Sequence, residues 1–307
     1  MEWFQFRFPW RNGPAGPAVC FIPDARTEQS AAEMKSPAIT PFRTAERSGV
    51  SGMLRVENLK KHFVIGVIRK HRVDAVKGVS FEIPEGGSLG IAGNSGCGKS
   101  TIARILMGLE EPDCGTIYLD GERQDALSAS AVRIRKKKMQ MIFQHPEASL
   151  DPQKTILSSM MEPMVIHKMC ESTRGRKERI RELFELVGIS ESLFSRYPHQ
   201  ISGGEAQRIM IARALTLEPK VLILDEPTSM LDVSIQAHMM NLLKDLGHKM
   251  NLTYLFISHD LEVLSWFCSH ICIMNQGTFV ETGKTEEIIH HPGHPFTREL
   301  VESFSEF

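Results

Sequence analysis

The sequence predicts an α/β fold built on a mostly parallel sheet, and two patterns carry this prediction. Short, wholly apolar runs such as 221–224 recur along the chain, as strands that are buried on both faces of a sheet require. Between these runs lie segments whose apolar residues repeat at helical spacing. Strands that alternate with helices favour a parallel sheet with helices covering both of its faces.

The individual elements follow from these patterns once residue 53 is passed. β-branched content predicts strands over 54–63 and 73–83, and short apolar runs predict further strands at 88–92, 139–143, 221–224, 254–257 and 271–274. Helical spacing predicts a helix over 99–108 with Ile102, Ile105, Leu106 and Leu109 on one face, a helix over 179–188 with Ile180, Leu183, Phe184 and Val187, and a helix with Ile235, Met239, Leu242 and Leu246. Gly188 is expected to end the second of these helices.

Composition and charge narrow the class of function. The 307 residues include 36 Lys and Arg against 37 Asp and Glu, which gives a formal net charge of −1. This balance argues against a nucleic-acid binder, because neutralising phosphates needs a surplus of basic residues. No stretch approaches the roughly 18 apolar residues of a membrane-spanning helix. Six scattered cysteines without a CxxC pair favour free thiols over a disulfide framework or a zinc site.

Residues 1–52 differ from the rest of the chain. They hold six prolines and show neither strand nor helix periodicity, which predicts a disordered leader. A second hypothesis is that the natural protein starts at Met53, because the motif-bearing sequence begins directly after it. The intact mass of the natively expressed protein distinguishes the two, since a mass that includes 1–52 contradicts the second hypothesis.

A phosphate-binding loop lies between a predicted strand and a predicted helix. Gly93, Asn94, Ser95, Gly96, Cys97, Gly98, Lys99 and Ser100 match the pattern G-x-x-x-x-G-K-[ST], and Thr101 follows them in the predicted nucleotide site. The glycines let backbone N–H groups turn toward the phosphates, and the helix N-terminus adds partial positive charge. Lys99 is expected to reach the β- and γ-phosphates, and Ser100 to offer its hydroxyl to Mg²⁺. The sequence therefore predicts a site for ATP and Mg²⁺.

The second half of this site is predicted at the end of the apolar run 221–224, which two acids follow. Ligands of a parallel sheet gather at the carboxyl ends of its strands. Asp225 is therefore expected near Mg²⁺, and Glu226 is expected to act on the attacking water as general base. Acids at strand ends are common, so that the pair alone is also compatible with two surface acids.

Further along the chain, Ile201, Ser202, Gly203, Gly204 and Glu205 resemble LSGGQ, the signature of the ATP-binding cassette (ABC) family. The resemblance covers about 54–307. It implies a P-loop NTPase fold of the ABC ATPase type, with a RecA-like core and mostly parallel sheet, an antiparallel β subdomain and an inserted α-helical subdomain. In the family, the signature serine and glycine amides form a second anion site, which closes on the γ-phosphate held by the opposite subunit.

Other family elements have counterparts here. Gln144 resembles the Q-loop glutamine, 229–232 resembles the D-loop, His259 resembles the switch histidine, and Phe63 is similar to the aromatic residue that stacks on adenine. The resemblance thus implies catalytic roles for Glu226, His259 and Gln144, nucleotide contacts by Phe63, the loop 93–101, Ser202, Gly203 and Gly204, and Mg²⁺ ligation by Ser100, Gln144 and Asp225. Glu205 departs from the glutamine of LSGGQ, and it is expected to point away from the phosphate.

Two longer patterns indicate a branch of the family. The Q-loop region 143–152 and the tail 291–300 resemble the dipeptide, oligopeptide and nickel importer ATPases, and the length of the tail favours the second-ATPase, or "F", type. The implied function is ATP hydrolysis that drives uptake of peptides or nickel from the cytoplasmic face of the cell membrane. The implied partners are a second cassette (a copy or a sister subunit), two membrane permeases and, indirectly, a solute-binding protein, with no nucleic acid.

The main rival function is an ATPase accessory to a multisubunit enzyme such as a carbon–phosphorus lyase complex. A translation or DNA-repair ATPase is disfavoured because such proteins usually carry two cassettes or a long coiled coil, and an ATP sensor without catalysis is disfavoured because Glu226 and His259 are both in place. The expected domain organisation is a leader over 1–52 and an ABC ATPase domain over 53–307. Within that domain we expect a nucleotide-binding core over 53–143 and 206–285, a helical subdomain over 144–205 and a tail over 286–307.

Four other features receive structural interpretations. His290, His291 and His294 lie in a Pro-rich tail without thiol or acid partners at ligand spacing, which favours a structural role over a metal site. The basic run 133–138 is expected to be a solvated helix end. Met160, Met161, Met164 and Met169 are expected to fill a core or a groove. Cys97 is expected to be a small spacer, with a lowered thiol pKa as a side hypothesis.

Overall fold

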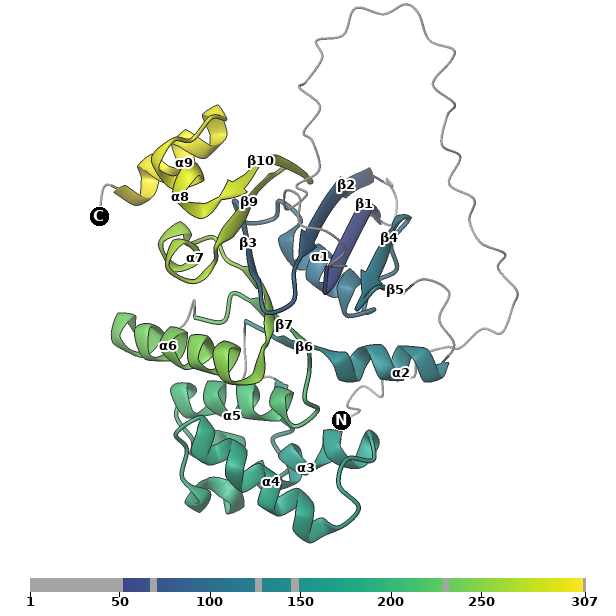
Figure 1. The fold of residues 1–307 in the computed structure, drawn as a ribbon, viewed down its shortest axis with the longest axis vertical. Coiled ribbons are helices and arrows are strands. Elements are labelled where there is room, and N and C mark those ends of the chain that lie inside the picture. Colours follow the sequence, from purple (N-terminus) through teal and green to yellow (C-terminus); the bar gives the residue numbers. More distant parts are fainter. Residues whose placement is uncertain (1–51, 67–70, 125–128, 145–148, 229–231, 306–307) are drawn as a thin grey trace, which may run out of the picture. The chain divides into compact units, whose positions relative to one another are not determined.

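The computed structural model describes residues 52–66, 71–124, 129–144, 149–228 and 232–305. The leader, except Gly52, and the D-loop segment 229–231 lie outside these ranges, so the predictions made for them stay predictions. Within the described ranges the strands form two sheets, one of six strands and one of four (Figure 1).

The six-stranded sheet has the order β10-β9-β3-β8-β7-β6. Its strands are β3 (Ser88–Ala92), β6 (Met139–Ile142), β7 (Val221–Asp225), β8 (Thr253–Ile257), β9 (His270–Asn275) and β10 (Thr278–Lys284). The neighbours from β6 to β9 pair in parallel, and only β10 runs antiparallel to its neighbour β9. The mostly parallel sheet that the sequence predicts is confirmed. Its parallel strands all end at one edge, where their following loops meet.

The four-stranded sheet is antiparallel and has the order β2-β1-β4-β5. It consists of β1 (Leu54–Ile65), β2 (His71–Ile83), β4 (Cys114–Leu119) and β5 (Glu122–Arg123). Its inner residues pack in one core cluster with the helix α1 (Lys99–Leu106) and one face of the six-stranded sheet. This sheet is the antiparallel β subdomain that the family resemblance implies.

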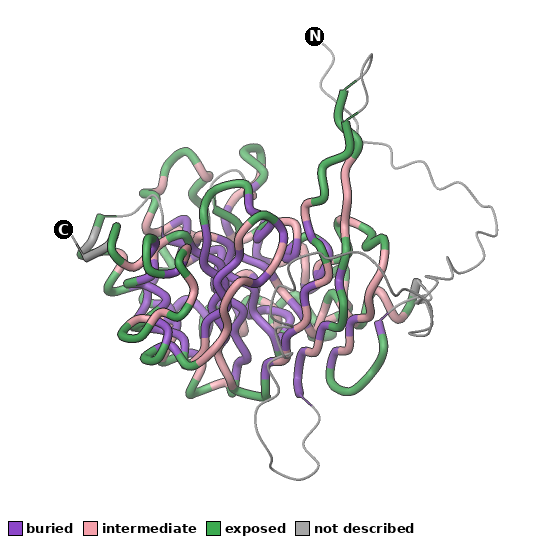
Figure 2. Tube along the Cα trace, turned by 90° about the horizontal axis from the view of Figure 1, so that it is seen from above, coloured by how far each residue is buried: buried purple, intermediate pink, exposed green. Residues whose placement is uncertain are grey.

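Alternation along β7, an inner strand of the sheet, shows why the parallel strands are apolar throughout. In β7, Val221 and Ile223 belong to the core cluster shared with the four-stranded sheet, whereas Leu222 and Leu224 belong to the opposite cluster. Successive side chains of a strand point to opposite faces, so a strand covered on both sides must be apolar at every position. Figure 2 shows these buried segments gathered in the interior of the described part.

The remaining helices flank the sheets. They are α2 (Ala129–Lys138), α3 (Ile156–Ile166), α4 (Thr173–Leu186), α5 (Gly203–Leu215), α6 (Val233–Met250), α7 (Leu261–Phe267), α8 (Thr285–His290) and α9 (Pro295–Ser305), with short 3-10 turns η2 (Glu191–Ser195) and η3 (Pro198–Gln200). Helices α3 and α4 pack on each other and on α5, below the sheet edge that carries β6 and β7 in Figure 1. They form the helical arm expected between Gln144 and Ile201.

Two helix faces differ in part from the sequence prediction. Leu109 is 54% exposed, because α1 ends at Leu106 and the chain turns away at Gly108 with φ 68°. In α6 the buried residues include Met239, Met240, Leu243 and Leu246, whereas Ile235 is 37% exposed and Leu242 is only partly buried. The buried stripe of α6 is thus rotated relative to the predicted one.

The cysteine thiols and the apolar character of the helices bear on two further sequence predictions. Cys97, Cys170, Cys268 and Cys272 are free thiols, as the sequence predicts for these four cysteines. Burial raises the pKa of the Cys97 thiol, and the side hypothesis of a lowered pKa is wrong. Within the described residues, no helix combines the length and the apolar character needed to cross a bilayer.

Candidate nucleotide site and docking groove

The loop after β3 has the geometry of a phosphate cradle. Gly98 forms the N-cap of α1 with φ 114°, and a Cβ at this position would collide with the carbonyl oxygen of Ala75. Lys99 is only 5% exposed, and its Nζ donates to the carbonyl oxygens of Gly93 at 2.7 Å and Asn94 at 3.0 Å. The lysine charge is therefore held inside the loop by the loop's own carbonyl oxygens.

A hydroxyl and a carboxylate from distant parts of the sequence meet beside this cradle. The Ser100 hydroxyl donates to Oδ1 of Asp225, the last residue of β7, at 3.1 Å. Burial raises the pKa of the Asp225 carboxyl, against the opposing effect of the Ser100 hydrogen bond. Mg²⁺ prefers oxygen ligands and is commonly held by one or two carboxylates together with phosphates. The donor set of Ser100 and Asp225 fits such an ion.

Glu226 connects three loops at the carboxyl edge of the sheet. Its Oε2 accepts a hydrogen bond from Gln144 Nε2 at 3.0 Å, and its Oε1 lies 3.2 Å from Nδ1 of His259. Gln144 follows β6, Glu226 follows β7 and His259 follows β8, and these strands are neighbours in the sheet. The backbone of Glu226 is left-handed, with φ 49°, and its N–H donates to the carbonyl oxygen of Ile257. The structure thus brings the three predicted catalytic side chains together.

Ser100, Gln144 and Glu226 border a cavity of about 640 Å³, whereas Asp225 and His259 do not line it. Its lining includes Phe63, the loop residues Ser95 to Thr101, Gln144 and Glu226. The sequence analysis did not single out other lining residues, namely Arg72, Val73, Asp74, Ala75, Lys77, Gln276 and Gly277. They come from the first half of β2 and from the β9–β10 turn, and no motif marks them, because only the folding of the chain brings these segments to the cradle.

The signature segment lies elsewhere. Ser202 is the N-cap of α5, and Gly203 and Gly204 form the first turn of that helix. None of these three residues lines the nucleotide cavity. The carboxylate of Glu205 turns back to the helix tip and accepts hydrogen bonds from the N–H and the hydroxyl of Ser202, while its orientation relative to a bound phosphate stays a prediction. The reason is local, because an acid three residues after a serine N-cap completes a capping box.

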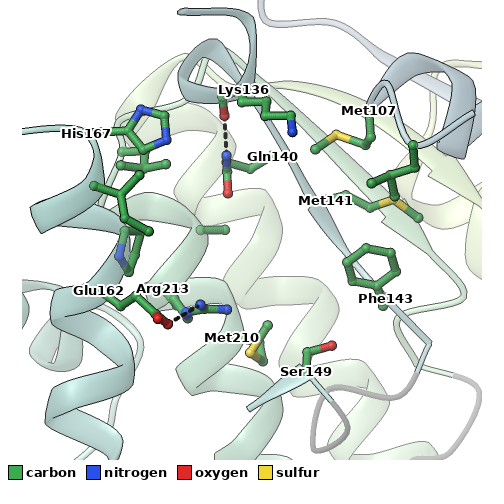
Figure 3. Close-up of a pocket in the computed structure, with 15 residues that line it drawn as sticks. Met107, Lys136, Gln140, Met141, Phe143, Ser149, Glu162, His167, Met210 and Arg213 are labelled. Carbon is green, nitrogen blue, oxygen red and sulfur yellow. Dashed lines mark hydrogen bonds and ion pairs between the residues drawn. The ribbon is translucent and has the colours of Figure 1, made fainter. Parts of the chain in front are cut away.

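A second hollow, of about 490 Å³, lies between the helical arm and the core (Figure 3). Its wall draws on α3, α5, β6 and the segments next to α1 and α2, and it includes Met107, Leu109, Lys136, Gln140, Met141, Phe143, Ser149, Glu162, Pro163, Ile166, His167, Met210, Arg213, Ala214 and Leu217. Several of its apolar members are well exposed: Leu109 at 54%, Phe143 at 39% and Ile166 at 54%. Exposed apolar groups gathered around one hollow are typical of a protein-docking surface. We call this hollow the docking groove.

The charges of the docking groove are uneven. Glu162 is paired within the chain, with Lys154 at 2.9 Å and with Arg213 at 3.4 Å. The basic run of α2, by contrast, is only in part a solvated helix end: Lys138 pairs with Asp120, and Arg135 is half-buried. Lys136 lines the groove, and within the described ranges it forms no ion pair. Lys136 therefore leaves a positive charge at one end of the groove.

The structure places the methionines of the helical arm in the core and shows a structural contact for His294 of the tail. Met160 and Met164 are fully buried in the core of the helical arm, and Met161 and Met169 pack against that core. In the tail, the N–H groups of Gly293 and His294 donate to the two carboxylate oxygens of Glu281 at 2.8 and 3.0 Å, and His294 Nδ1 accepts from the N–H of Phe296 at 3.1 Å. The histidine of the tail motif caps a helix.

A cradle, a buried carboxylate and a glutamate held by a glutamine and a histidine define a nucleotide-binding ATPase site of the P-loop class. Comparison with protein families matches residues 76–229 to the family described as "ABC transporter". The chain belongs to the ABC transporter family, as the motifs predicted.

Relatives and solved structures agree with this assignment. The chain is 45% identical over 258 residues to "Oligopeptide transport ATP-binding protein AppF" of Bacillus subtilis, a match that covers 82% of this chain and 78% of the relative. It is 41% identical over 252 residues to "Dipeptide transport ATP-binding protein DppF" of Haemophilus influenzae, with 81% and 77% covered. The "Dimeric structure of a post-hydrolysis state of the ATP-binding cassette MJ0796 bound to ADP and Pi" is similar in fold, with a TM-score of 0.68, 30% identity and coverage of 76% of this chain and 99% of that chain. The predicted ABC ATPase fold is confirmed.

Proposed function

We propose that this chain is the ATP-hydrolysing subunit of an ABC importer that takes up peptides, attached to the cytoplasmic face of the cell membrane through permease partners. The observation that carries the proposal is the contact of Glu226 with both Gln144 and His259, next to the pair formed by Ser100 and Asp225. These contacts join groups for metal binding, water activation and phosphate sensing at one sheet edge.

In the proposed reaction, Lys99 gives up its loop carbonyl partners and binds the β- and γ-phosphates of ATP. Ser100, Gln144 and Asp225 hold Mg²⁺, which supplies charge neutralisation on the phosphate oxygens. Glu226 accepts a proton from the water whose oxygen attacks the γ-phosphorus, while the bond from this phosphorus to the bridging oxygen of ADP breaks. His259 contacts the γ-phosphate. Phe63 stacks on adenine from the β1 side of the cavity.

The signature segment completes the site of another chain in this proposal. Ser202, Gly203 and Gly204 do not reach this chain's own cavity, so they are assigned to the γ-phosphate bound by a partner cassette, either a second copy or a sister subunit. The solved cassette reported above is itself described as dimeric. A lone chain is expected to be nearly inactive.

The docking groove is assigned to a permease. Closure of two cassettes around ATP moves the helical arm relative to the core, and a permease segment seated between them carries that movement to the membrane. The apolar wall supports this assignment because exposed apolar side chains gain from burial against a partner. Peptides are favoured as the solute because the relatives named above are peptide transport proteins, and a solute-binding protein would select them. Nickel is the alternative solute, and no observation favours an accessory ATPase of a carbon–phosphorus lyase complex.

Uptake measurements test the proposal. Cells that lack the chain are expected to lose uptake of a labelled dipeptide or oligopeptide, and the wild-type chain is expected to restore it while Glu226→Gln does not. Uptake of radioactive nickel is measured in the same cells. Loss of nickel uptake with intact peptide uptake would replace peptides by nickel, and unchanged uptake of both would contradict the importer function.

A further inference from the structure

The signature tip, Ser202 to Glu205, is closed by contacts within its own chain. The Ser202 N–H and the Ser202 hydroxyl both donate to Oε2 of Glu205, each at 2.8 Å, and the N–H of Glu205 donates to Ser202 Oγ at 3.3 Å. The bonds from Ser202 hold the pKa of the Glu205 carboxyl below its usual range, so Glu205 is ionised at neutral pH. A negatively charged carboxylate is therefore hydrogen-bonded to Ser202, the serine that the proposed function assigns to a γ-phosphate.

The outer face of the same tip is open. Ser202 and Gly203 are exposed, and a Cβ placed on Gly203 would meet no atom within 4 Å. Gly204 is less open, since a Cβ there would lie 3.6 Å from Cγ2 of Ile235. Nothing in this chain's packing therefore requires a glycine at position 203. Glycine is also the residue that lets another group approach the backbone closely, and Gly203 fits such an approach from outside the chain.

We propose that Glu205 opposes the ATP-driven association of two cassettes and so sets the ATP concentration at which they close. The inference rests on the proposed function, in which the partner's γ-phosphate meets this tip. The carboxylate already uses the Ser202 hydroxyl as a donor and offsets the partial positive charge of the α5 N-terminus. An arriving phosphate carries the same sign of charge and needs the same donor, so Glu205 must yield the hydroxyl before the site closes.

Replacing Glu205 by glutamine separates the effect of its negative charge from the effect of its capping contacts with Ser202. A glutamine at this position keeps the capping box, since its amide oxygen accepts from the Ser202 N–H, but it carries no charge. An alanine removes both the charge and the capping contacts, which loosens the first turn of α5. Glu205 is thus a positioning residue whose charge acts on association, while the nucleotide cavity of its own chain is untouched because Glu205 does not line it.

The test uses the full chain with Glu226→Gln, which is expected to bind ATP without turnover. Association is followed by sedimentation velocity while MgATP is titrated. Adding Glu205→Gln is expected to lower the ATP concentration of half-maximal association by about tenfold, and the difference is expected to shrink as salt rises, because screening weakens charge repulsion. Binding of a fluorescent ATP analogue to the isolated chain is expected to stay unchanged.

Two control variants distinguish the effect of the Glu205 charge from loss of any helix-terminal acid and from loss of the capping contacts. Glu286→Gln removes another exposed acid from the first turn of a helix, α8, and is expected to leave association unchanged. Glu205→Ala is expected to associate less readily than Glu205→Gln. Association of Glu205→Gln at the same or a higher ATP concentration than its parent overturns the inference, and so does an equal shift in nucleotide binding by the isolated chain. A parent chain that binds ATP but never associates contradicts a two-chain site formed by two copies of this chain.

Discussion

The nucleotide cavity and the docking groove are hollows of comparable size, about 640 and 490 Å³, but they are built differently. The cavity is polar, and its functional groups already contact one another: Ser100 meets Asp225, and Glu226 meets Gln144 and His259. The groove is mostly apolar, and several of its side chains, such as Ile166, stay exposed. This difference is consistent with the proposed roles of the cavity in catalysis and of the groove in docking a partner.

The two hollows should therefore respond differently to substitution. A change in the cavity is expected to alter ATP binding or hydrolysis in the isolated chain. A change in the groove is expected to leave these unaltered and to weaken only the association with permease partners and the transport that depends on it.

The largest effect is expected for Glu226→Gln, which removes the proposed general base. ATPase activity is expected to fall by at least about 100-fold, since loss of general base catalysis typically costs that much. ATP binding is retained because Lys99 and the loop are intact. Steady-state hydrolysis and equilibrium binding of labelled ATP are measured in parallel, with Glu299→Gln, an exposed residue of α9, as the control. Wild-type turnover in Glu226→Gln would show that another group activates the water.

The groove offers a matched pair of substitutions on α3. Ile166 lines the groove and Val165 does not, although they are exposed to the same extent, 54% and 53%. Ile166→Asp is expected to weaken association with the purified permease pair by about tenfold or more, because it places a charge in an apolar contact. Val165→Asp is expected to have little effect, and both variants are expected to keep the ATP binding of the isolated chain. Equal losses from both substitutions would argue against the groove as the permease site.

Phe63 tests how the cavity recognises the base. Phe63→Ala is expected to weaken ATP binding by about tenfold, as loss of stacking on one base typically does, whereas Phe63→Trp keeps a π-face and is expected to bind normally. Equilibrium binding of ATP and of triphosphate alone separates base recognition from phosphate binding. If Phe63→Ala bound ATP as the wild type does, adenine would have to lie elsewhere.

The smallest effect concerns Asp225. Its folded-state pKa is raised by burial, so its ionisation works against folding as pH rises through that pKa. Asp225→Asn is accordingly expected to stabilise the ligand-free chain at neutral pH by up to about 1 kcal/mol, with the gain disappearing in acid, where Asp225 of the wild type is protonated. The same variant is expected to lose the additional stabilisation by MgATP over ATP alone. Thermal unfolding at several pH values measures both effects, and lower stability of the variant at neutral pH would contradict the expectation.

The sequence could point to these nucleotide-site residues because chemistry fixes their spacing. Gly93 to Ser100 must be consecutive to wrap a phosphate, and Asp225, Glu226 and His259 lie at or just beyond the carboxyl ends of two neighbouring apolar strands, β7 and β8. The groove was not predicted, because Met107, Pro163 and Met210 are far apart in the sequence and no spacing rule links them. The capping box between Ser202 and Glu205 was not predicted, although a serine followed three residues later by a glutamate is its sequence pattern.

The composite site is tested most directly by mixing two inactive chains. Lys99→Ala destroys the cradle and Ser202→Arg blocks the signature tip, and each variant alone is expected to lack ATPase activity. In a mixed pair, the cradle of the Ser202→Arg chain meets the intact signature tip of the Lys99→Ala chain, which restores one complete site. Recovery of ATPase activity on mixing is the predicted result. Two chains that each stay inactive when mixed, although sedimentation shows that they associate, would contradict a site shared between protomers.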